Sequence, residues 1–88
     1  MEITDSPLQF PTDFPLKIMG RNTAAFAQEI VALVLLHAPD FDATTVEMRP
    51  SKGGNYIGLT CTIRAISREQ LDNLYRALSS HPLVSVVL

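Results

Sequence analysis

Alternating apolar and polar positions predict three strands along the chain, at residues 14–20, 45–50 and 55–65. The third alternation continues for nearly its whole segment, which is typical of a strand with one buried side and one solvent-facing side. The positions expected to face inward are Ile57, Leu59, Cys61, Ile63 and Ala65 in the third strand, with Val46 and Met48 in the second. A final apolar run at residues 83–88 predicts a fourth strand.

The first predicted helix lies between the first two strands. It runs to His37 after a cap at Asn22 or Thr23, and Pro39 ends it. Its apolar residues extend over more than one side, so the helix should be covered from more than one direction. We expect the N-terminal arm or a partner subunit to supply the second cover.

The second predicted helix follows the third strand and has a clear start. Ser67 and Gln70 have the spacing of a capping box, and Ile66 and Leu71 have that of a hydrophobic staple. Apolar residues then recur at helical spacing until the "SSHP" segment ends the helix.

The predicted order is therefore strand, helix, strand, strand, helix, strand, which is the order of an α+β, ferredoxin-like fold. We expect a βαββαβ sandwich with a four-stranded antiparallel sheet of order 4-1-3-2 and both helices on one face. The domain should occupy residues 14–88. An extended arm at residues 1–13 should precede it, with Leu8 and Phe10 packed against the domain.

Composition and charge narrow the class of protein. The 88 residues are 47% hydrophobic and 18% charged, which suits one small folded domain. The formal net charge of −2 argues against a nucleic-acid binder. No segment resembles a signal peptide, and no apolar run reaches the ~20 residues that cross a bilayer. Cys61 is the single cysteine, so we expect no disulfide and a cytoplasmic location without membrane association.

Five short segments, taken together and in order, resemble the YbeD family of small bacterial proteins. They are "FPTDFPLKIMG", "HAP", "SKGGNY", "LDNLYRAL" and "VSVVL", and the resemblance covers residues 8–88. It implies a cytoplasmic domain similar in fold to ACT-type regulatory domains, with no assigned biochemical role and no catalytic residues to carry over. Some genes of that family lie near lipoate-attachment genes.

The "SKGGNY" segment, residues 51–56, admits two interpretations. A glycine pair between two strands is typical of a hairpin turn, because glycine tolerates positive φ. Alternatively, Lys52 and the loop amides could hold an anion, although phosphate-binding loops open onto a helix and this one opens onto a strand. We favour the hairpin and retain Lys52 and Asn55 as candidate binding residues.

No combination of residues predicts an enzyme, a cofactor site or a metal site. Cys61 should face the core, where a thiol is inert. His37 and His81 each lie at a helix end with no carboxylate or cysteine pattern nearby, so we expect them to cap those helices. Arg21 and Asn55 have the residue types of an acylphosphatase site, but the glycine-rich loop that should surround the arginine is missing.

The polar side of the predicted sheet is the remaining candidate surface. The residues assigned to it or to its margins are Lys17, Arg21, Arg49, Lys52, Asn55, Tyr56 and Arg64. Tyrosine and arginine are enriched at binding hot spots. We therefore expect a non-enzymatic binding or regulatory module, either a monomer or a weak homodimer, that acts through a partner protein or a small metabolite.

Two alternative functions remain open at this point. An ACT-like sensor linked to lipoate metabolism would work as a dimer and bind its ligand near Gly20, Arg21 and Asn22. An RNA-binding sheet would stack bases on aromatic side chains of the central strands. Tyr56 is the one aromatic residue expected on that side of the central strands, and this argues against RNA.

Overall fold

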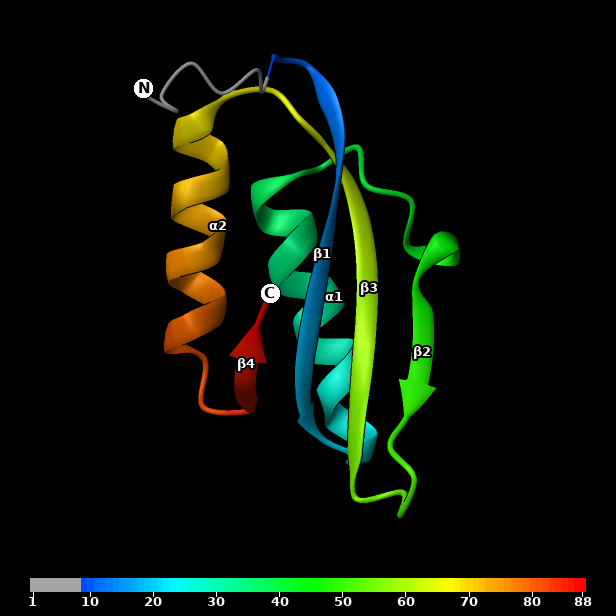
Figure 1. Cartoon of the computed structure of the whole chain (residues 1–88). Helices are drawn as coiled ribbons and strands as arrows, with labels where there is room; N and C mark the ends of the chain where they lie inside the picture. The colour runs from blue at the N-terminus through cyan, green and yellow to red at the C-terminus, as the bar shows by residue number, and fades with distance from the viewer. Residues whose placement is uncertain (1–8) are drawn as a thin grey trace, which may run out of the picture.

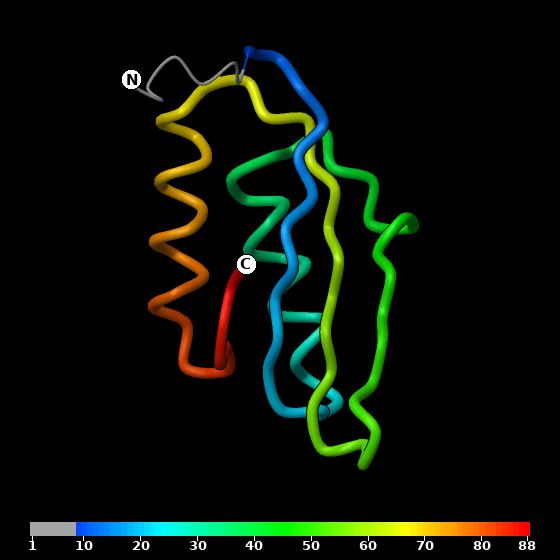
Figure 2. The backbone as a smooth tube through the Cα atoms, viewed as in Figure 1, coloured from blue at the N-terminus to red at the C-terminus, as the bar shows by residue number. Residues whose placement is uncertain are grey.

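Two long antiparallel strands run side by side through the middle of the molecule, and helices cover one face of their sheet (Figures 1 and 2). The computed structural model describes residues 9–88. The elements are β1 Thr12–Arg21, α1 Ala24–His37, the 3-10 helix η2 Ala43–Thr45, β2 Glu47–Pro50, β3 Tyr56–Ala65, α2 Arg68–Ser80 and β4 Val84–Val87. The strand order is β2-β3-β1-β4. The predicted ferredoxin-like βαββαβ fold is confirmed.

The pairing of β1 with β3 divides their side chains between two faces. Their register runs without interruption from the Thr12↔Ala65 pair to the Arg21↔Tyr56 pair. Opposed residues share a face, so the Ile18↔Leu59 pair lies on the helix side, where both residues are fully buried. The alternate positions point the other way, onto a face that we call the open sheet face.

A single core fills the space between the sheet and the helices. Helix α1 contributes Phe26, Ile30 and Val34, and helix α2 contributes Leu71, Leu74 and Leu78. Each fully buried side chain of this kind stabilises the fold by about 1.5–3 kcal/mol. The inward set predicted for β3 is confirmed, because its members from Leu59 to Ala65 are buried and Ile57 packs against the core.

The N-terminal arm is described only in part. Phe10 is half-buried and packs against the core, as predicted, whereas Leu8 lies outside the described residues. Strand β1 already begins at Thr12, before the predicted start of the domain. Helix α1 keeps Leu36 75% exposed, and the cover predicted for its second side stays a prediction.

Strand β2 is shorter and more exposed than predicted. Asp42 accepts hydrogen bonds from the Thr44 amide (3.0 Å) and hydroxyl (2.6 Å), which cap η2 and lower the pKa of the Asp42 carboxyl. Since η2 extends to Thr45, β2 begins at Glu47 and not at residue 45 as predicted. Met48 pairs with Leu59 and so points to the helix side. It is nevertheless 59% exposed, because β2 is an edge strand.

The start of α2 also joins the two helices. The Gln70 amide donates to Ser67 Oγ (3.0 Å), as a capping box requires. Gln70 Oε1, however, accepts from the Ile66 amide (2.7 Å), and its Nε2 donates to the His37 carbonyl at the end of α1 (3.0 Å). The predicted staple is wrong in one respect, since Ile66 remains 64% exposed.

Gly20 marks a close approach between the sheet and α1. A Cβ atom at this position would overlap the Leu83 carbonyl oxygen and the Phe26 ring. Glycine is therefore required here by packing, although its backbone φ is not in the left-handed region.

The Gly20→Ala substitution should lower the free energy of unfolding by about 1–3 kcal/mol, because the added methyl group overpacks a tight contact. Urea denaturation measures this change. Gly53→Ala is the matched control, since the nearest atom to its new Cβ is Asn55 Nδ2 at 3.7 Å. Equal stability of the two variants would contradict the packing argument.

Candidate binding surface

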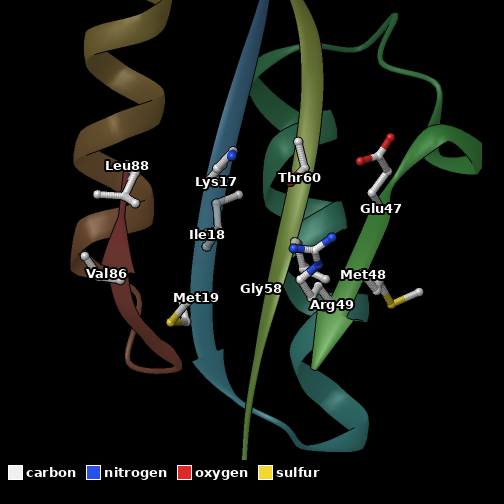
Figure 3. Close-up of a pocket in the computed structure, with 11 residues that line it drawn as sticks. Lys17, Ile18, Met19, Glu47, Met48, Arg49, Gly58, Thr60, Val86 and Leu88 are labelled. Atoms are coloured by element: carbon white, nitrogen blue, oxygen red, sulfur yellow. The ribbon is translucent and has the colours of Figure 1, made fainter. Parts of the chain in front are cut away.

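A groove of about 400 Å³ crosses the open sheet face and touches all four strands (Figure 3). Lys17 and Met19 of β1 lie at its centre, beside Gly58 and Thr60 of β3. Arg49 of β2 borders one side, and Val86 and Leu88 at β4 border the other. The groove thus combines an apolar side with cationic side chains.

The apolar side of the groove arises from strand pairing. Met19 is opposite Val86 in the sheet, and the Leu88 amide and carbonyl exchange hydrogen bonds with Lys17 (2.7 and 3.2 Å). All three apolar side chains consequently point onto the open sheet face, where Met19 is 42%, Val86 41% and Leu88 69% exposed. Within residues 9–88, the helices lie on the other side of the sheet and leave this face uncovered (Figure 1).

The structure brings only two of the predicted surface residues together in the groove. Lys17 and Arg49 line it, as the alternation of their strands indicates. Arg64 lies toward the other end of β3, with its Nη1 3.7 Å from Asp13 Oδ1, and both side chains are largely exposed. Arg21 places its guanidinium 5.6 Å from the centre of the Tyr56 ring, outside the groove.

The groove also contains residues that the sequence analysis did not name as candidate binding residues. Met19, Gly58, Val86 and Leu88 were missed because a candidate surface was sought among polar side chains. The alternation did place Met19 on the polar side of the first strand. Val86 could have been assigned only with the register between the first and last strands, which short strands do not reveal.

The "SKGGNY" segment forms a hairpin turn. The Gly54 amide donates to the Ser51 carbonyl (2.9 Å). The Ser51 amide donates to the Tyr56 carbonyl (2.8 Å), and this bond joins the two strands at the base of the turn. Gly54 has a φ of 79°, the left-handed conformation that favours glycine. The turn therefore accounts for the glycine at position 54, and the Lys52 side chain in the same turn is exposed.

The corner after β1 is closed by this hairpin. Asn22 donates from its backbone amide to the Asn55 carbonyl (2.9 Å) and from Nδ2 to the Gly54 carbonyl (3.1 Å). Gly20 is buried against Leu83 and Phe26. Arg21 and Asn22 remain exposed at this corner, and the ACT-like ligand site expected near Gly20, Arg21 and Asn22 stays a prediction.

Charge is distributed unevenly between the open sheet face and the rest of the chain. The face carries four basic residues, Lys17, Arg21, Arg49 and Arg64, and two acidic residues, Asp13 and Glu47. Its formal charge is +2, whereas the whole chain carries −2. Two of these basic residues, Lys17 and Arg49, and one of the acidic residues, Glu47, line the groove, whose formal charge is therefore +1.

The single cysteine, Cys61, lies in the core, and His81 contacts other groups of the protein. Cys61 is fully buried, and burial raises the pKa of its thiol to about 11. His81 Nδ1 accepts from the Leu83 amide (3.0 Å), and its Nε2 lies 3.2 Å from Glu29 Oε1. His81 is the C-cap residue of α2, as expected, but its imidazole contacts Leu83 and Glu29 rather than the end of the helix. The local sequence shows no carboxylate beside His81, because Glu29 comes from the distant helix α1.

Comparison with solved structures defines the class of fold. Protein HP0495 from H. pylori superposes with a TM-score of 0.75 at 12% identity, covering 100% of this chain and 96% of its own. The ACT domain from GTP pyrophosphokinase of Chlorobium tepidum superposes with a TM-score of 0.59 at 18% identity, covering 88% and 97%. The chain therefore has an ACT-like, ferredoxin-like fold.

Sequence comparison then identifies the family. The family described as "Protein of unknown function (DUF493)" matches residues 5–88. A UPF0250 protein of Bordetella pertussis is 60% identical over 84 residues, covering 96% of this chain and 92% of its own length. A UPF0250 protein of Nitrosomonas europaea is 51% identical over 84 residues, covering 96% and 97%. The chain belongs to the DUF493/UPF0250 family, and the predicted YbeD-like resemblance is confirmed.

Within the described residues, none of the helices has the length and apolar character needed to cross a membrane. The same part of the chain holds no cluster of three or more residues suited to binding a metal ion.

The free energy of unfolding should fall as the pH rises from 9 to 11, by about 2 kcal/mol at the upper end. The unfolded thiol ionises near pH 9, whereas the folded Cys61 holds its proton until about pH 11, so alkaline pH favours the unfolded state. Urea denaturation at several pH values measures this loss.

Cys61→Ala is the control for this experiment. Burial also raises the pKa of the Tyr75 phenol, so some alkaline loss should remain in the variant. An identical pH dependence in the two proteins would show that Cys61 is not the group responsible.

Proposed function

We propose that this protein is a non-enzymatic binding module that contacts a partner protein through its open sheet face. The observation that carries the proposal is the groove itself, which gathers the exposed side chains of Met19, Val86 and Leu88 beside Lys17 and Arg49 on the open sheet face. Exposed apolar clusters with a polar rim are typical of protein interaction sites.

The shape of the groove favours a protein over a small metabolite. Sites for small molecules are concave and bury most of the ligand surface. Here Met19 and Val86 remain more than two-fifths exposed and Leu88 more than two-thirds, so a small ligand would stay largely in solvent. A protein partner can cover the whole face and remove these side chains from water.

The candidate reactive groups support a role without catalysis. A thiol with a raised pKa is a poor nucleophile, because the thiolate is the reactive form. Both nitrogens of His81 face groups of the protein itself, the Leu83 amide and Glu29. Neither residue is arranged to attack a substrate or to transfer a proton to one.

The two alternative functions have less support. At the corner where an ACT-like sensor would bind its ligand, the Asn22 amide and side chain already donate hydrogen bonds to the hairpin, so a ligand would compete with these contacts. For RNA binding, Tyr56 is the aromatic residue on the described part of the open sheet face, and the Arg21 guanidinium lies over its ring. A base would have to displace that contact before stacking.

A photoreactive amino acid at position 62, introduced in the native cells, should cross-link the protein to a discrete partner. Thr62 lies exposed on the open sheet face, next to the groove, so the probe would reach a partner without filling its site. Mass spectrometry of the adduct identifies the partner and the linked residues.

Position 72 is the matched control, because Asp72 is exposed on α2, outside the sheet. The proposal expects an adduct from position 62, none from position 72, and loss of the adduct when Val86→Lys places a charge in the groove. Absence of any adduct at position 62, or equal adducts from both positions, would refute this function.

A further inference from the structure

Gly58 occupies an unusual place for a glycine, in the interior of a central strand. The register puts it between Met19 of β1 and Arg49 of β2, and it forms part of the floor of the groove (Figure 3). Glycine weakens a strand interior, because it loses more backbone entropy on folding and offers no side chain to pack. Its presence in β3 therefore requires a reason.

The fold itself supplies no such reason. A Cβ atom at Gly58 would meet only the Arg49 carbonyl oxygen and Met19 Cε, both at 3.9 Å, which is ordinary van der Waals contact. The φ of Gly58 is outside the left-handed region, which only Gly54 occupies among the described residues. Gly20 differs sharply, since packing forbids any side chain there.

The missing side chain leaves a notch between side chains of different character. Met19 and Val86 make the β4 side of the groove apolar. Lys17 lies along the same strand as Met19, and Arg49 stands on the opposite side, so cations flank the notch. Glu47 also lines the groove at β2, which directs an incoming carboxylate toward Lys17 rather than toward the β2 edge.

We infer that Gly58 is a specificity-determining position, forming a notch that receives an apolar side chain from an acidic segment of the partner protein. This inference rests on the proposed function and names the chemistry of the partner. The apolar side chain contacts the Gly58 backbone, Met19 and Val86, while carboxylates of the segment lie near Lys17. The +2 charge of the open sheet face complements such a segment and would accelerate its association.

Substitution of Gly58 should affect stability and binding in opposite directions. Gly58→Ala and Gly58→Val should unfold at the same urea concentration as the unsubstituted protein or at a higher one, because alanine and valine fit the strand better. Both variants should nevertheless bind less tightly, since the new side chain fills the notch. A clear loss of stability in Gly58→Ala would show that the glycine serves the fold and would overturn the inference.

Binding is measured with a library of random peptides displayed on phage and selected on the immobilised full chain. Selected peptides should carry an apolar residue flanked by Asp or Glu. For one of them, fluorescence anisotropy should show that Gly58→Val raises the Kd at least about tenfold. Thr62→Val is the matched control, because it places valine on the same strand and face outside the groove, and it should leave the Kd within about twofold.

A second pair of variants tests the charge. Lys17→Gln should lower the affinity for the selected peptide and reduce the salt dependence of its binding. Arg64→Gln removes a charge outside the groove and should change neither the affinity nor its salt dependence. Enrichment of basic peptides, or no enrichment, would overturn the inference. Unchanged binding of the peptide by Gly58→Val would also overturn the inference. In that case, a cross-linked adduct from position 62 would still support the proposed function.

Discussion

The antiparallel pairing of β1 with β3 is the constraint on which the rest of the structure depends. Ten consecutive residue pairs join the two strands, and each pair commits both of its side chains to the same side of the sheet. Ile18 and Leu59 are thereby committed to the core, and Lys17 and Thr60 to the groove. A shift by one residue would exchange these sets and place a lysine in an apolar interior.

The core and the groove are therefore both consequences of the register between β1 and β3. The two helices pack against one face of this strand pair. Gly20 lets α1 approach the sheet closely, and Gln70 fastens the start of α2 to the end of α1. The covered face is thus packed against both helices. The open sheet face lies on the other side of the same strands, so the strand register sets the relative positions of Met19, Gly58 and Val86 in the groove.

The fold could be predicted from the sequence because its signals are local. The alternation in β3 and the Ser67–Gln70 spacing before α2 each depend on a few neighbouring residues. The beginning of β2 could not be predicted, because the Asp42 side chain accepts a hydrogen bond from the Thr44 amide and so favours a turn over a strand. The sequence of residues 43–46 is compatible with either structure.

The groove was only partly predictable, for a different physical reason. Lys17 and Arg49 follow from the phase of their own strands, but the contribution of Val86 depends on which residue of β1 it pairs with. Glu29 and His81 meet only because α1 and the end of α2 pack on the same layer. The basic character of the open sheet face, by contrast, followed from the alternation, which assigned Lys17, Arg49 and Arg64 to the polar side although the whole chain is acidic.

The two hydrogen bonds from Asn22 to the turn after β2 have a consequence for how this domain can vary in length. Many β-hairpins accept inserted residues because their tips are surrounded by solvent. Here the tip is tied to the β1–α1 connection, so an insertion between Ser51 and Asn55 would release that connection as well. Loop grafting or tag insertion is better directed to the exposed residues 42–45, whose turn is closed by its own neighbours, and away from the buried Ala38 and Phe41 that precede it.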